Sequence, residues 1–236
     1  MQMINVRLKF SKGEEVKYIS HLDLMRTFQR AIRRAGLPIA YSTGFNPHQE
    51  ISFGAPLALG VTSSAEYVDM WLSEKIEMNY MIDKLNETLP SGIKVSDGIV
   101  LSDKAKNAMS LVTHSRYTIK FKLENADEKI IQEKIDTFLE QEQILIKKEQ
   151  PKKNFALKEI DIKAMIYQMK LLFVKENECF LNCLLSSGSK ANLKPELLME
   201  AFQNFCNWDI KRVKINREET YTEIEGKLVD LIELYR

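Results

Sequence analysis

Cysteine is scarce in this chain, and the cysteines lack the close pairing of common metal sites. Cys179, Cys183 and Cys206 are an odd number of thiols, and no two of them have CxxC spacing. Zinc and iron–sulfur centres use closely grouped thiolates, so we predict no metal and no cofactor. Thiols without this pairing indicate a reducing compartment, which predicts a cytoplasmic protein.

Long apolar runs are also missing. No stretch reaches the length of about 18 residues that a membrane-spanning helix requires. The chain begins MQMINVRLKF, which alternates apolar and polar side chains and so does not have the pattern of a secretory signal. We therefore expect no membrane partner.

Neither sign of charge is in excess. The chain has 34 lysines and arginines against 33 aspartates and glutamates, which gives a net charge of +1. This balance excludes a chain that is strongly basic throughout, as many nucleic-acid-binding proteins are. It still allows a local basic surface that acids elsewhere offset.

The sequence contains a repeated order of strands and helices. Alternation of apolar and polar residues predicts a strand over 4–10, and apolar residues at helical spacing predict a helix over 20–35. The remaining elements predicted in this half are extended segments near 38–42, 51–53 and 65–72, a helix near 78–89 and a strand near 93–101. The second half repeats this order after a polar stretch at 102–110, which we interpret as a linker.

Two βαββαβ halves in series predict an α+β protein of two tandem ferredoxin-like domains with antiparallel sheets. We place the first domain at 1–103 and the second at 112–236. The tail, 218–236, carries apolar residues at partly helical spacing, which predicts a helix that docks on the second domain.

The helix at 20–35 carries an arginine stripe. Ser20 is a predicted N-cap, and Asp23 three residues later completes a short-armed capping box. Asp23 is the one acid in the helix, and the arginines are Arg26, Arg30, Arg33 and Arg34. Because arginine binds phosphate and carboxylate bidentately, the stripe predicts a contact with an anion or with RNA. A solvated helix face is the alternative interpretation.

The segment after this helix combines turn residues with aromatic rings. STGFNPHQE, residues 42–50, has the composition of a turn, and FGAPLALG, residues 53–60, is a second glycine-containing loop. Turn formation alone can explain these residues, but rings beside arginines can also stack on bases. The predicted RNA- or anion-binding residues are Arg26, Arg30, Arg33, Arg34, Tyr41, Phe45, Asn46 and His48.

The stretch KYISHLDLMRTFQRAIRRAGLPIAYSTGFNPHQEISFGAPLALGV, residues 17–61, resembles the N-terminal signature of the radical-SAM-linked family, whose bacterial domains occur alone or C-terminal to radical SAM proteins. Weaker similarity continues in KEIDIKAMI (158–166) and NLKPELLMEAF (192–202). The chain has no CxxxCxxC motif, so the resemblance implies the linked module without the iron–sulfur chemistry. Gln49 and Glu50 follow His48 where the family often has a basic residue, which lowers the local positive charge.

These observations leave several functions open. We expect an RNA-binding or substrate-presenting module rather than an enzyme. One alternative is a metal-independent RNA-processing endonuclease, by analogy with the fold plan of CRISPR-repeat endoribonucleases, with His21 and His48 as general acid and base. Another is a protein-interaction adaptor for a separate radical SAM protein. A metal site formed by His21, Asp23 and His48 is a remote further alternative.

Overall fold

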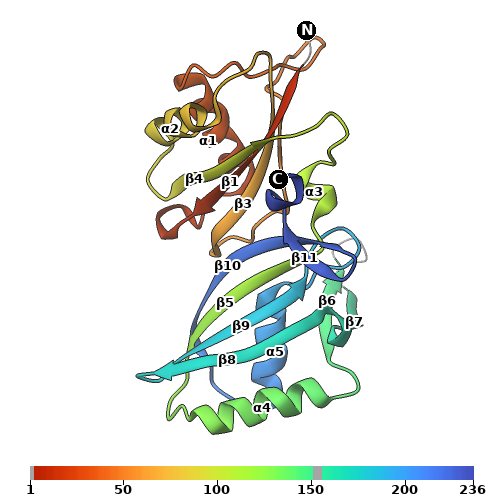
Figure 1. Cartoon of the computed structure of the whole chain (residues 1–236). Helices are drawn as coiled ribbons and strands as arrows, with labels where there is room; N and C mark the ends of the chain where they lie inside the picture. Colours follow the sequence, from red (N-terminus) through yellow and green to blue (C-terminus); the bar gives the residue numbers. More distant parts are fainter. Residues whose placement is uncertain (1–2, 151–155) are drawn as a thin grey trace. The chain divides into compact units, whose positions relative to one another are not determined.

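The computed structural model describes residues 3–150 and 156–236, which form two compact units (Figure 1). The first unit comprises Met1–His114 and Asn216–Arg236, and the second comprises Ser115–Ile215. Residues 216–236 therefore belong to the first unit, whereas the sequence suggested a place with the second domain. No helix in the described ranges is long and apolar enough to cross a membrane.

The first unit contains one complete βαββαβ set. Its elements are β1 (Ile4–Lys12), α1 (His21–Arg34), β2 (Ile51–Phe53), β3 (Thr62–Leu72), α2 (Met78–Thr88) and β4 (Ile93–Val100), with a short 3-10 turn, η1 (Glu14–Val16). The strands are ordered β4-β1-β3, and β2 pairs with β3. The pairs β1–β3, β1–β4 and β2–β3 are all antiparallel.

Alternation along β1 decides which face of this sheet meets the helices. Val6, Leu8 and Phe10 are buried in one core with Leu24 and Phe28 of α1. Figure 1 shows α1 and α2 on the same side of the sheet. The side chains that alternate with this apolar set project to the opposite face.

The opposite face of the first sheet is covered by other segments of the same unit. These are α3 (Ala108–Leu111), Leu231 and Ile232 just after β11 (Lys227–Asp230), and η4 (Glu233–Tyr235). A second apolar cluster forms there from Tyr67, Ala108, Leu111, Val112, Leu231 and Ile232. This face is therefore an internal packing surface rather than an open platform.

The second unit repeats the βαββαβ order and adds a hairpin. Its elements are β5 (His114–Lys122), α4 (Glu128–Glu140), β6 (Leu145–Gln150), β7 (Ala156–Asp161), η3 (Lys163–Met165), β8 (Ile166–Lys175), β9 (Glu178–Ser186), α5 (Pro195–Cys206) and the start of β10 (Lys211–Ile224). From Asn216 onward β10 belongs to the first unit. The strand order is β10-β5-β9-β8, while β6 and β7 pair only with each other among the described strands. When this hairpin is left out, the strand order of the second unit matches that of the first unit. The predicted α+β fold of two tandem ferredoxin-like domains is therefore confirmed.

The helical prediction for the tail is wrong. β10 continues to Ile224 and turns back into β11 through Glu225 and Gly226, whose φ angles are 51° and 76°. A two-residue turn with positive φ at both positions suits the twist of a β-hairpin. The apolar spacing that suggested a helix is thus divided between two strands and a short 3-10 turn.

The three thiols should be almost unreactive in the folded protein. Cys179, Cys183 and Cys206 are free and buried, and burial raises their pKa values to about 11, about 12 and about 11. At about pH 8, a thiol with such a pKa is ionised to roughly one part in a thousand or less. We expect Ellman's reagent to label all three thiols rapidly in guanidinium and none rapidly in buffer. Fast labelling of any thiol in buffer would contradict this burial.

Candidate functional site

The start of α1 is fixed by a cap and by aromatic packing. The Ser20 hydroxyl accepts a hydrogen bond from the Asp23 N–H at 3.1 Å and donates one to the Asp23 carboxylate at 2.7 Å. The bond from Ser20 is the main reason that the pKa of Asp23 lies below its ordinary value. His21 lies edge-on to Phe53, with ring centroids 5.6 Å apart, and Phe53 packs in turn against Phe28.

The four arginines of α1 have different surroundings. Arg34 donates a hydrogen bond to the Thr88 carbonyl at the end of α2, so it serves the packing of the two helices. Arg26 lies 3.4 Å from Asp23 in an exposed pair, which contributes little to stability. Arg30 and Arg33 are exposed, and among the described residues their guanidinium groups have no ionic or hydrogen-bonding partner. These two arginines are the cations of α1 that remain available to an anion.

The loop at 41–48 is closed by a serine–histidine link. The Ser42 hydroxyl lies 2.7 Å from His48 Nδ1 and accepts a hydrogen bond from the His48 N–H, while the Ser42 N–H donates to the His48 carbonyl. These bonds leave Phe45 at the loop tip fully exposed, and Asn46 is exposed beside it. The loop therefore presents an aromatic ring to solvent on a defined backbone turn.

Gln49 joins this loop to the arginine helix. Its side-chain amide donates a hydrogen bond to the Gln29 carbonyl at 3.3 Å and lies 3.5 Å from the Tyr41 hydroxyl. Arg26 and Arg33 lie three residues before and four after Gln29, so they share its side of the helix. The structure thus attaches the loop and the half-exposed Tyr41 ring to the helix that carries the arginines.

The two histidines proposed as acid and base have separate environments. His21 packs on Phe53, whereas His48 is held by Ser42. No hydrogen bond joins the two imidazoles within the part of the chain that the structure describes. Residues 3–150 and 156–236, which the structure describes, also contain no group of three or more histidine, cysteine, aspartate or glutamate side chains arranged to hold a metal.

A buried charge cluster fixes the second glycine-containing loop, and the sequence analysis missed it. Arg217 of β10 donates to the carbonyls of Ala55 and Pro56 and lies 3.0 Å from Glu66 of β3. Lys12 donates to the carbonyls of Lys17 and Ile19 at 3.0 and 3.3 Å. Burial lowers the pKa of Lys12, while Glu66 raises it. The segment before α1 and the loop at 53–60 are therefore each anchored through backbone carbonyls to a buried cation.

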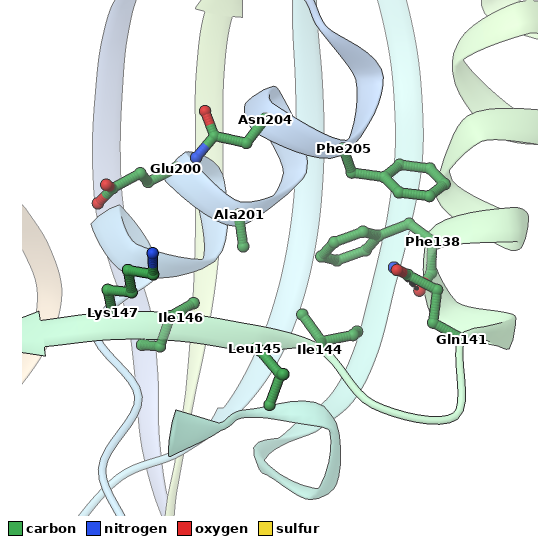
Figure 2. A pocket seen from close by; sticks show the side chains of 10 residues that line it. All are labelled: Phe138, Gln141, Ile144, Leu145, Ile146, Lys147, Glu200, Ala201, Asn204 and Phe205. Atoms are coloured by element: carbon green, nitrogen blue, oxygen red, sulfur yellow. Dashed lines mark hydrogen bonds between the residues drawn. The ribbon is translucent and has the colours of Figure 1, made fainter. Parts of the chain in front are cut away.

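The second unit contains a pocket of about 450 Å³ between α4, β6 and α5 (Figure 2). Its lining residues are Phe138, Gln141, Ile144, Leu145, Ile146, Lys147, Glu200, Ala201, Asn204 and Phe205. Figure 2 shows the two phenylalanine rings at one end and Lys147 and Glu200 at the other. The volume suits a small molecule, but no motif in the sequence indicates this pocket.

Comparison with known proteins gives a family and a fold. A family model described as "Uncharacterized protein conserved in bacteria (DUF2344)" matches residues 5–195, and its description names no radical SAM protein. No curated protein matches the sequence. A solved Cbf5-Nop10-Gar1 complex matches with a TM-score of 0.50 and 10% identity, covering 94% of this chain and 50% of that chain.

A second solved structure, an H/ACA RNP bound to a substrate RNA containing 2′-deoxyuridine, matches with a TM-score of 0.49 and 10% identity. This match covers 94% of the present chain and 49% of the other. The chain thus spans about half the length of these two solved chains. At such low identity, the likeness to the Cbf5-Nop10-Gar1 complex shows a shared fold alone.

Proposed function

Because the chain belongs to the DUF2344 family of uncharacterized bacterial proteins, whose description assigns no reaction, we propose its function from its own surface. The proposed function is RNA binding, and the contact surface consists of α1 and the loop at 41–48. One observation carries the proposal. Arg30 and Arg33 are exposed without partners among the described residues, and Gln49 attaches to their helix the loop that presents the exposed Phe45 ring.

Arginines without partners are suited to phosphate. A guanidinium group offers a planar fork of donors that matches two phosphate oxygens. Asp23 is the one acid in α1, and it already lies beside Arg26. The far end of the helix therefore carries uncompensated positive charge, although the whole chain is nearly neutral.

The exposed rings of the loop are suited to bases. A phenylalanine that projects fully into water gains no burial in the protein, but an unpaired base can stack on it, worth about 1–3 kcal/mol. Tyr41 presents a second, half-exposed ring nearby. Rings beside phosphate-binding cations are the combination that single-stranded RNA requires.

The surroundings of the histidines favour binding over cleavage. A general acid–base pair needs both groups within reach of one phosphodiester. Here His48 Nδ1 is engaged by Ser42, and His21 packs against Phe53, which gives each imidazole a structural role. The substrate-presenting role, which the sequence left open beside RNA binding, requires the same RNA contact, and the same experiment tests it.

The test is the affinity of the protein for a fluorescein-labelled single-stranded RNA of about 20 nucleotides at about 50 mM salt. We expect Arg30→Ala/Arg33→Ala to weaken binding by about tenfold or more, because two guanidinium groups no longer bind phosphate. The plot of log affinity against log salt should also become shallower, by roughly 0.7 for each phosphate that the variant no longer neutralises. Anisotropy titrations at several salt concentrations measure both quantities.

The control removes two exposed cations from another part of the first unit. Lys75→Ala/Lys94→Ala makes the same change in net charge away from α1 and the loop. Its affinity should stay within about twofold of the wild type. Equal losses in both double variants, or binding by the wild type that is independent of salt, would overturn the proposed contact surface.

A further inference from the structure

The sheet of the second unit has one face directed at its helices and one directed away from them. In β5, Tyr117, Ile119 and Phe121 are buried, and in β9 the alternating residues Cys179, Leu181 and Cys183 are fully buried. Figure 1 shows α5 behind the strands of this unit. Because these side chains are buried, we assign them to the face that the helices cover. The side chains between them form the opposite face, which we name the β5–β9–β8 face.

Contacts across the strands show which side chains share this face. Arg116 of β5 donates hydrogen bonds to Gln168 of β8 and Asn182 of β9, at 2.9 and 2.7 Å. Lys170 is directly opposite Asn182 in the antiparallel register of β8 and β9. Since directly paired residues project to the same side of a sheet, Lys170 belongs to this face as well.

The charge of the β5–β9–β8 face is strongly unbalanced. Its cations on these three strands are Arg116, Lys120, Lys122, Lys170 and Lys175, and its one acid is Glu178. Glu178 pairs with Lys120 at 2.6 Å, and Lys120, Lys122 and Lys214 all lower its pKa. Lys214 of β10 is exposed and precedes the buried Ile215 in the strand, so it projects to the side opposite Ile215 and extends the same positive surface. Such local charge suits a polyanion, although the whole chain has a net charge of only +1.

Two stacked rings lie among these cations. Phe173 and Phe180 have centroids 4.4 Å apart and an interplanar angle of 25°. Lys120 lies 5.3 Å from the Phe180 ring centroid, and Phe173 is 46% exposed. An exposed ring at the end of a stack offers a free aromatic surface to which a further ring can add.

We propose that the β5–β9–β8 face binds single-stranded RNA, with bases stacked on Phe173 and phosphates on Lys122, Lys170 and Lys214. The choice of RNA as the ligand rests on the proposed function. The residues of this face, however, differ from those of α1 and the loop at 41–48, and they lie in the second unit. A duplex buries its base faces in its own stack, so the exposed ring selects unpaired bases. The site is a second RNA contact, independent of α1.

The experiment compares Lys122→Ala/Lys170→Ala with Lys129→Ala/Lys134→Ala in the full chain. The control pair is exposed on α4, on the helix side of the sheet, and makes the same change in net charge. We expect about tenfold weaker binding of single-stranded RNA for the first variant and a change within about twofold for the second. Equal affinities of the two variants would overturn the proposal.

A second variant separates stacking from charge. Phe173→Ala should weaken single-strand binding several-fold and leave its salt dependence unchanged, whereas Phe173→Tyr should retain wild-type affinity. The fluorescence of 2-aminopurine in the RNA should be quenched by the wild type and not by Phe173→Ala. Tighter binding of a duplex than of a single strand would contradict the stacking. Preference for single-stranded DNA over RNA would overturn the RNA assignment.

Failure of this site and failure of the proposed function give different results. If Arg30→Ala/Arg33→Ala loses affinity and Lys122→Ala/Lys170→Ala does not, the α1 surface stands and the second RNA site is overturned. The reverse pattern supports the β5–β9–β8 face and overturns the α1 surface. A wild type that binds no single-stranded nucleic acid overturns both.

Discussion

Replacing Asp69 with alanine should lower the free energy of unfolding by about 3–5 kcal/mol, which is the usual cost of leaving a buried charge without its partner. Arg7 and Asp69 have fully buried side chains and form two hydrogen bonds, of 2.7 and 2.9 Å. Arg7 also donates to the carbonyls of Leu231 and Lys106. The pair therefore holds the linker and the C-terminal segment on the first sheet.

The measurement is urea unfolding in a Trp208→Phe background, which leaves Trp71 of the first unit as the single tryptophan. Glu87→Ala serves as the control, because it breaks an exposed pair with Lys84 and should change stability by less than about 1 kcal/mol. The double variant Arg7→Leu/Asp69→Leu should lose less free energy of unfolding than Asp69→Ala, since apolar groups replace both charges. A loss below about 1 kcal/mol for Asp69→Ala would show that Arg7 needs no buried partner.

Regular elements could be predicted from the sequence because their signals are local. β1 follows from the alternation of Val6, Leu8 and Phe10 with polar residues, and α1 from its cap and its apolar spacing. The repetition of this order in both halves led to the tandem ferredoxin-like fold. Each of these signals comes from residues within a few positions of one another.

The tail could not be predicted in the same way. The turn at Glu225 and Gly226 separates two strands whose apolar residues imitate helical spacing when the turn is overlooked. The place of Leu231 and Ile232 in a cluster with Tyr67 is set by contacts more than 150 positions apart in the sequence. Local periodicity contains no information about such contacts.

The candidate site was predicted only in part. The sequence placed four arginines on α1, but it could not show that Arg34 donates a hydrogen bond to the Thr88 carbonyl of α2. The basic face of the second unit was missed for a related reason. Lys122 and Lys170 are 48 positions apart, and only the strand order β5-β9-β8 brings them to one face.

Replacing Glu66 with alanine should also lower the free energy of unfolding by about 3–5 kcal/mol, because two buried cations would lose their shared anion. Glu66 lies 3.0 Å from Arg217 and raises the pKa of Lys12. Both cations hold carbonyls of the 17–61 stretch, through Lys17 and Ala55 among others. Glu74→Ala, at an exposed acid of the same unit, is the control and should change stability by less than about 0.5 kcal/mol.

The loss of free energy of unfolding caused by Glu66→Ala should become smaller as the pH rises. Burial already places the pKa of Lys12 below its ordinary value of 10.5, and removal of Glu66 takes away the group that raises it. Between the lowered folded pKa and the unfolded one, the folded state binds fewer protons than the unfolded state, so stability increases with pH. Urea unfolding from about pH 7 to about pH 10 should show the variant approaching the wild type. If the difference in free energy of unfolding between the wild type and Glu66→Ala stays constant or widens over this range, Lys12 remains charged in the variant and finds another partner. In that case only Arg217 depends on Glu66.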